Sequence, residues 1–168
     1  SLGLKANRVH FSNISINKSY YNFLPKAMLG YRLNENSFIR YDVEMSQTNP
    51  TLVKLTDTEI RLDPYLAERG NLLLKPYSNL NNNLFYEHKK GLFTFNANLR
   101  HHYKHNPIME SVKEQGNIFL IIPENMKSWN KYNAEMNLKV GMIKNILQFS
   151  LTGGYNHFNS QGNNYSHE

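Results

Sequence analysis

The sequence predicts an all-β protein, an antiparallel meander of about seven strands. Three observations predict it: side chains alternate between apolar and polar with a period of two, connections alternate between short and long, and aromatic residues gather near strand ends. The 12% aromatic residues, mostly Tyr and Phe, favour strands over helices. The 168 residues include no cysteine, and no apolar run approaches the roughly 20 residues of a membrane-spanning helix.

The alternation places the strands in chain order. Seven segments carry it: residues 2–11, 23–33, 37–45, 79–87, 92–103, 129–140 and 146–155. The first is the weakest, because its apolar face switches near Arg8, where a β-bulge is expected. In the fourth, Asn82 interrupts an otherwise apolar face. Each strand is therefore expected to have one apolar and one polar face.

The polar faces are too charged for a dry core. The polar set consists of Arg40, Asp42, Glu44, Asn96, Asn98, Arg100, Asn133, Glu135, Asn137 and Lys139. On the lipid side of a membrane barrel an Arg or Lys at mid-bilayer costs about 2–4 kcal/mol, whereas a wet lumen tolerates it. We therefore expect a transmembrane β-barrel with these ten residues facing the lumen.

The connections agree with this expectation. Short ones, at residues 34–36, 88–91 and 141–145, are rich in Asn, Gly and Lys, whereas long ones cover 12–22, 46–77, 104–128 and the stretch after 155. Outer-membrane barrels have short periplasmic turns on one side and long extracellular loops on the other. Aromatic residues on the long-loop side are expected to form a girdle at the headgroup level: Tyr20, Tyr21, Phe23, Tyr103, Trp129, Tyr132 and Tyr155.

The chain is expected to be one segment of a larger barrel domain. Bacterial single-chain barrels use an even number of strands, eight or more, and about seven are predicted here. The first eight residues lack the basic and apolar regions of a secretion signal, which leaves either a cytoplasmic protein or a piece of a longer one. Residues 1–168 are therefore interpreted as a single barrel segment without a plug domain and without the remaining strands.

Sequence motifs point to a family. Residues 23–31 read Phe-Leu-Pro-Lys-Ala-Met-Leu-Gly-Tyr, with Pro25 and Tyr31, and residues 34–41 add a turn and an alternating strand. Residues 70–78 read Gly-Asn-Leu-Leu-Leu-Lys-Pro-Tyr-Ser, and their motif positions are Gly70, Asn71, Leu74, Lys75 and Pro76. This order resembles the later barrel of TonB-dependent receptors, of the Bacteroidetes outer-membrane type. Leu72 and Tyr77 depart from the usual Pro and Glu. The motif is expected to be structural, because Pro76 suits a strand entrance and Gly70 a turn.

The resemblance implies a function in transport. A complete protein of this type would take up a scarce nutrient, an iron chelate or a glycan fragment, that the long loops capture. The implied partners are outer-membrane lipid, the small nutrient, a plug domain and TonB, which moves the plug. No cofactor is implied. An isolated segment is expected to oligomerise, because its apolar faces would otherwise stay exposed to water.

Other functions find less support in the sequence. A net charge of +6 and a pI near 9.4 suit nucleic acid, but the basic residues are dispersed among acidic ones and no binding motif accompanies them. The cluster of His101, His102 and His105 suggests a metal site. Adjacent strand residues point to opposite faces, however, and no cysteine is present, so no metal site is expected.

No catalytic residues are expected either. Acidic residues of one long loop, Asp57, Glu59, Asp63 and Glu68, lack any feature that would fix them as a catalytic pair. Two alternatives stay open. One is a soluble β-sandwich-like binding or structural module, and the other is an outer-membrane barrel enzyme such as a lipase or protease, which would need a nucleophile or paired acids.

Overall fold

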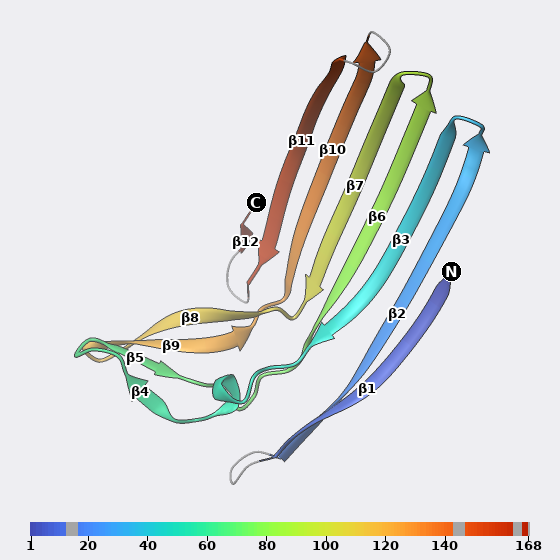
Figure 1. The fold of residues 1–168 in the computed structure, drawn as a ribbon. Coiled ribbons are helices and arrows are strands. Elements are labelled where there is room, and N and C mark those ends of the chain that lie inside the picture. The colour runs from blue at the N-terminus through green and yellow to red at the C-terminus, as the bar shows by residue number, and fades with distance from the viewer. Residues whose placement is uncertain (13–16, 143–146, 163–165, 168) are drawn as a thin grey trace.

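Most of the chain forms one large antiparallel sheet. The computed structural model describes residues 1–12, 17–142, 147–162 and 166–167 (Figure 1). The sheet has the order β1-β2-β3-β6-β7-β10-β11-β12. Its strands are β1 (Leu2–Ser12), β2 (Asn17–Asn34), β3 (Ser37–Thr48), β6 (Tyr77–Lys90), β7 (Phe93–His105), β10 (Ser128–Met142), β11 (Leu147–Gln161) and β12 (Ser166–His167). The seven long strands confirm the predicted meander. Among the described residues, no helix is long and apolar enough to cross a membrane.

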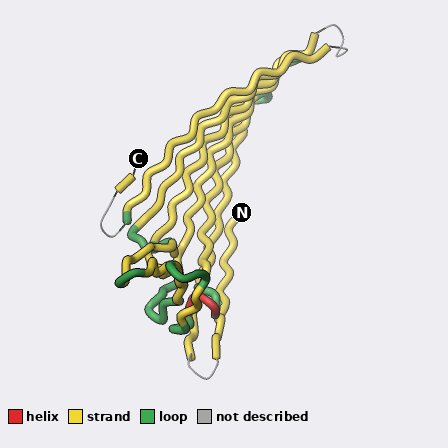
Figure 2. Tube along the Cα trace, turned by 90° about the vertical axis from the view of Figure 1, so that its left-hand side faces the viewer, coloured by secondary structure: helices red, strands yellow, loops and turns green. Residues whose placement is uncertain are grey.

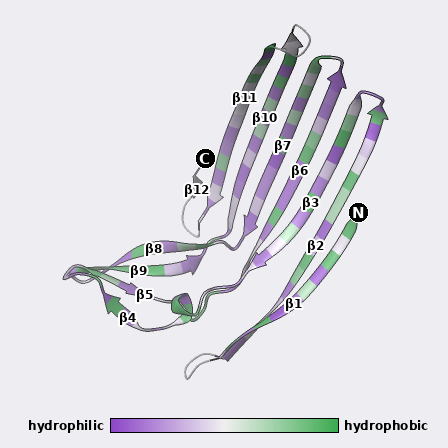
Figure 3. Cartoon of the chain, viewed as in Figure 1, coloured by the Kyte–Doolittle hydropathy of each residue, from purple (hydrophilic) through white to green (hydrophobic). Residues whose placement is uncertain are grey.

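The period-two alternation continues from strand to strand through most of the sheet. Paired residues in an antiparallel sheet share a face, so most rows of partners have one character. One row is apolar and joins Leu29, Tyr41, Leu84, Leu99 and Ala134. A neighbouring row is polar and joins Asp42, Asn83, Arg100 and Asn133. Figure 3 shows the resulting bands of hydropathy along every long strand.

Among the described residues of this sheet, no dry core forms on the apolar face. Phe93, Met136 and Phe149 remain 39%, 55% and 54% exposed, although their rows would have to pack together in a sandwich. Figure 2 shows the sheet as a single curved layer. The arrangement therefore argues against the soluble sandwich and matches a wall whose apolar side meets lipid.

The buried core lies instead in the two long loops. These loops contain a short 3-10 helix, η1 (Val53–Leu55), and four strands: β4 (Glu59–Arg61), β5 (Leu66–Arg69), β8 (Ile108–Gln115) and β9 (Ile118–Asn125). The strands form a second sheet of order β4-β5-β9-β8, in which β5 and β9 pair in parallel. Ala67, Leu120 and Ile122 are buried together there. We call this unit, residues 49–76 and 106–127, the loop module.

A second buried cluster joins the loop module to the large sheet. Leu55 and Leu74 pack together, and Phe11 of β1 and Ile108 of β8 lie against them. The Lys18 ammonium of β2 also donates a hydrogen bond to the Leu72 carbonyl. The contacts to the loop module thus come from the part of the β1–β2 hairpin in which β2 does not pair with β3.

Two of the short connections are two-residue turns. Residues 35–36 join β2 to β3, with the Asn36 N–H donating to Asn34 Oδ1 at 2.9 Å. Residues 91–92 join β6 to β7, and Gly91 adopts a positive φ of 58°. The third predicted short connection, 141–145, lies partly outside the described residues, as does the predicted strand start at Ile146.

Several predictions about the first hairpin are wrong. Strands β1 and β2 pair from Leu2 with Ala27 to Ser12 with Asn17 without a register shift, so there is no bulge at Arg8. Residues 17–22 belong to β2 rather than to a long loop, while residues 13–16 lie outside the described part. The apolar pattern fails near Arg8 because the ribbon continues past the apolar band, where neither face has to be apolar.

The end of the wall at β2 has a simple cause. Pairing between β2 and β3 starts at Lys26 with Glu44, one residue after Pro25, whereas pairing with β1 continues on both sides of it. Proline has no N–H to donate to a ladder. Residues 17–25 therefore form a two-stranded ribbon with β1 alone.

Candidate functional site

The ten residues predicted to face the lumen lie on one face of the large sheet. They occupy adjacent rows of β3, β7 and β10, and none shares a row with Leu84 or Leu99. We call this side the polar face and the opposite side the apolar face. All four acidic residues of the seven long strands belong to the polar face: Asp42, Glu44, Glu87 and Glu135.

Ion pairs and amides hold several charged side chains of the polar face. Arg40 Nε donates to Asp42 Oδ2 at 2.9 Å, and Asn83 Nδ2 approaches the same oxygen at 3.4 Å. Arg100 and Glu135 lie 3.6 Å apart. Such partly exposed pairs each contribute about 0.2–1 kcal/mol, so their main effect is to orient the side chains rather than to stabilise the wall.

Basic and aromatic side chains gather at the loop end of the polar face. His102 and Lys104 of β7, Trp129 and Lys131 of β10, and Phe158 of β11 occupy two adjacent rows. Lys104 Nζ lies 4.7 Å from the centroid of the Trp129 ring, and Lys131 Nζ lies 5.1 Å from that of Phe158. We call these five residues the basic–aromatic cluster.

The cluster is internally ordered. The Trp129 and Phe158 ring centroids are 6.3 Å apart, and His102 Nδ1 lies 2.6 Å from Asn81 Oδ1. The nearest acid of these rows, Glu44, is paired with Lys26 at 3.5 Å. Cations over aromatic rings and an imidazole near them suit an anionic ligand that carries flat or apolar groups.

This cluster is not evident from the sequence alone. Trp129 was expected in the lipid-side girdle, but it pairs with Lys104 and Ser160 and so lies on the polar face; Tyr20 lies there too, opposite Val9. The other girdle candidates, Tyr21, Phe23, Tyr103, Tyr132 and Tyr155, do lie on the apolar face. Counting in twos from Glu135 to Trp129 would have found the correct side.

The Gly-Asn motif sits where the two loops meet. A Cβ at Gly70 would lie 2.8 Å from the Lys54 carbonyl oxygen and would also meet those of Thr56 and Val53, so only glycine fits. The Asn71 N–H donates to the Lys54 carbonyl at 2.7 Å, and its side-chain amide donates to the Pro123 carbonyl at 3.0 Å.

The Leu-Lys-Pro part of the motif leads into β6. Leu74 is 2% exposed, and Pro76 immediately precedes the first residue of the strand, Tyr77. Asn125 accepts a hydrogen bond from the Lys75 N–H at 2.9 Å and donates one to the Lys75 carbonyl at 3.0 Å. Pro25 and Tyr31 lie apart from this junction, on the apolar face of β2.

The histidines do not form a metal site in the described residues. No group of three or more His, Asp or Glu side chains converges there. His101 pairs with Asn82 and Tyr132, whereas His102 pairs with Asn81 and Lys131, so the two rings lie on opposite faces. The loop acids Asp57, Glu59, Asp63 and Glu68 are spread over β4, β5 and their connections, and Asp57 lies 3.9 Å from Arg69.

The fold is similar to two solved receptors. The crystal structure of the siderophore receptor PirA from Pseudomonas aeruginosa matches with a TM-score of 0.70 and 18% identity, over 84% of this chain and 29% of that chain. The ferric enterobactin receptor PfeA, in complex with BCV-L6, matches with a TM-score of 0.62 and 18% identity, over 79% of this chain and 22% of that chain. At this identity the likeness concerns the fold. No curated protein matches the chain.

A family model matches nearly the whole chain. The Outer membrane protein beta-barrel family matches residues 5–168. This match agrees with the single-layered sheet, its apolar side and its segregated turns and loops, and it places the chain in the outer membrane. The chain belongs to the outer membrane protein beta-barrel family.

Proposed function

We propose that this chain forms part of the wall of a TonB-dependent receptor that takes up an anionic iron chelate. The fold likeness to siderophore receptors supports the class of protein, and the motif at residues 70–76 supports the Bacteroidetes type. The observation that carries the ligand class is the basic–aromatic cluster. It places Lys104 and Lys131 over aromatic rings at the loop end of the polar face.

The polar face would line the lumen. Its ten predicted residues share one side of the wall, and their three basic and three acidic members balance, with Asp42 paired to Arg40 and Glu135 paired to Arg100. A ligand captured at the cluster would then pass along a hydrated polar surface. In this proposal a plug domain fills the lumen, and TonB displaces it.

The loop module would hold the extracellular opening in shape. Asn71 and Asn125 link its two loops through backbone contacts, and Leu74 packs into its core. The Gly-Asn and Lys-Pro motif would thus position the ligand-capturing end without touching ligand. Residues 1–168 alone would oligomerise in water, because the apolar face stays exposed.

A glycan is the second ligand class, and one observation favours it. The polar face carries many amides that both donate and accept hydrogen bonds, as sugar hydroxyls require. They include Asn81, Asn83, Asn96, Asn98, Asn133 and Asn137. The two ligand classes differ in charge, so removing the cluster lysines separates them.

The test removes both cluster lysines from the complete receptor. A Lys104→Ala/Lys131→Ala variant should bind a ferric tris-catecholate at least about tenfold more weakly, the equivalent of about 1.4 kcal/mol. Quenching of tryptophan fluorescence measures the binding. The matched control, Lys89→Ala/Lys90→Ala, removes two charges at the turn end of the sheet and should bind within about twofold of wild type.

Two results would overturn the iron-chelate proposal. One is equal affinity of the cluster variant and the control variant for the tris-catecholate. The other is binding of a neutral oligosaccharide by the wild type with no binding of the chelate, and this result would support the glycan class instead.

A further inference from the structure

The apolar face changes character near its loop end. His101 of β7, Tyr132 of β10 and His157 of β11 form one row across three neighbouring strands of this face. The His101 and Tyr132 rings stack with centroids 4.5 Å apart and planes 10° apart, and the Tyr132 and His157 centroids are 6.2 Å apart. We call these three residues the histidine rim.

The rim is fixed from one side and open on the other. His101 Nδ1 lies 3.4 Å from Asn82 Nδ2, and its Nε2 lies 3.1 Å from Asn130 Oδ1, so both ring nitrogens are held. The stacked His101 in turn orients Tyr132. Neither the Tyr132 hydroxyl nor the His157 ring has a hydrogen-bond partner elsewhere in the described chain.

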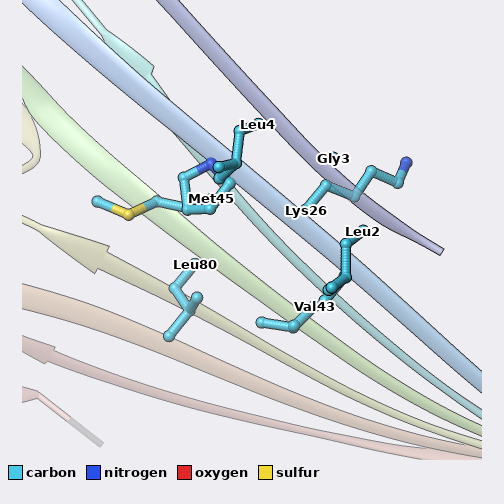
Figure 4. Close-up of a pocket in the computed structure, with 9 residues that line it drawn as sticks. Leu2, Gly3, Leu4, Lys26, Val43, Met45 and Leu80 are labelled. Atoms are coloured by element: carbon cyan, nitrogen blue, oxygen red, sulfur yellow. The ribbon is translucent and has the colours of Figure 1, made fainter.

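An apolar hollow adjoins the rim on the side towards the short turns. It is lined by Leu84, Leu99, Ala134 and Tyr155 of β6, β7, β10 and β11. The rim residues His101 and Tyr132 border its loop-side end. A similar hollow opens on the same face over β1, β2, β3 and β6, where Leu2, Leu4, Val43, Met45 and Leu80 surround it (Figure 4). Hydrocarbon chains fit such hollows, whereas water gains few partners in them.

The height of the rim matches a lipid headgroup. His101 lies eight positions along β7 from Phe93, which starts the strand at the turn end. At about 3.3 Å per residue and a strand tilt of about 40°, this separation spans about 20 Å, close to the roughly 25 Å apolar band of an outer-membrane barrel. The rim therefore falls at the outer boundary of the hydrocarbon layer.

The loop end of the apolar face offers hydrogen-bond donors to an anionic headgroup. All the acids of the long strands lie on the polar face, whereas the loop end of the apolar face carries basic side chains and no described acid. Those side chains are Arg8, His10, His101, His105 and His157. The imidazoles and the Tyr132 hydroxyl can donate hydrogen bonds to a phosphate, and no carboxylate of the described long strands competes for them on this face.

We propose that the histidine rim binds the phosphate of an outer-leaflet lipid. His157 and the Tyr132 hydroxyl donate to the phosphate, His101 positions Tyr132, and one acyl chain of the lipid occupies the hollow between Leu84 and Tyr155. The site lies on the outside of the wall and so acts independently of the nutrient that the polar face takes up.

The test measures lipid retention by the complete barrel. Delipidated protein is titrated with bisphosphorylated lipid A in detergent, and native mass spectrometry counts the bound lipid. Wild type should bind lipid A at least about tenfold more tightly than its fully dephosphorylated form. A Tyr132→Phe/His157→Gln variant should lose this difference. The control His88→Gln changes an imidazole on the same face at the turn end of the sheet and should keep the difference.

Three outcomes would overturn the proposal: equal retention of the phosphorylated and dephosphorylated lipids by wild type, unchanged retention by the double variant, or displacement of the lipid by millimolar inorganic phosphate. The first comparison uses the unaltered protein and needs no folded variant. Chelate binding by the same preparation is measured separately, so failure of the lipid site and failure of the proposed uptake are distinguishable.

Discussion

His101 and His102 are consecutive in the chain, yet they belong to different environments. The His101 ring stacks on Tyr132 with centroids 4.5 Å apart on the apolar face, while His102 Nδ1 lies 2.6 Å from Asn81 Oδ1 on the polar face. Strand geometry alone separates them, because successive side chains point to opposite sides. One peptide bond therefore divides the surface proposed for lipid from the surface proposed for nutrient.

The assignment of faces predicts that an arginine substitution affects stability very differently at two neighbouring positions. Met136 and Ala97 pair on the apolar face, four positions from both Val140 and Tyr132, whereas the next residue, Asn137, lies on the polar face. Met136→Arg should destabilise the barrel in lipid vesicles by about 2–4 kcal/mol, because it places a charge near mid-bilayer. Asn137→Arg should change stability by less than about 1 kcal/mol. Unfolding in guanidinium from vesicles measures both, and equal effects would contradict the assignment.

The close approach at Gly70 predicts that alanine is not tolerated there. A Cβ would press on the carbonyl oxygens of Lys54, Thr56 and Val53, and overpacking of this kind costs about 1–3 kcal/mol. Gly70→Ala should increase protease cleavage within residues 49–76 by about fivefold or more. Gly153→Ala is the control, because its Cβ would meet nothing within 4 Å. Unchanged cleavage of the Gly70 variant would rule out this role.

The hairpin of β8 and β9 should weaken in acid. A hydrogen bond from Lys113 lowers the pKa of Glu124 below its ordinary value. A lowered folded pKa adds stability above the unfolded pKa of about 4.3, and that stability is lost as the pH falls through the folded pKa. Amide protection factors of residues 108–125 should therefore drop between pH 5 and pH 3 more in wild type than in Glu124→Gln. Parallel loss in both would show that another group is responsible.

The wall could be predicted from the sequence because its information is local. Alternation assigns each side chain of β7 or β10 to a face without reference to other strands. The β3 and β10 residues proposed for the lumen follow from that count. The loop module does not, because β4 has only three residues and β5 pairs in parallel with β9, some 50 residues away. Leu66 and Ala67 show no alternation that would mark a strand.

The basic–aromatic cluster was only partly accessible from the sequence. His102, Lys104 and Lys131 fall on the polar side by simple counting, but their approach to Trp129 and Phe158 depends on strand register. Phe158 also lies beyond the predicted strand end at Tyr155, since β11 continues to Gln161. Proximity to a strand end suggests a lipid-side role for Trp129, whereas its register with Lys104 puts it on the polar face.

Pro25 marks the point at which the first hairpin, β1 and β2, loses its β3 neighbour. From Lys26 towards the turn, β2 pairs with both β1 and β3. Before Lys26 it pairs with β1 alone, and Phe11 of this ribbon packs against Leu55 and Leu74. Strands β3, β6, β7 and β10 also lead directly into the loop module. The loop module is thus attached to the sheet in two ways, through the chain itself and through its packing against the first hairpin.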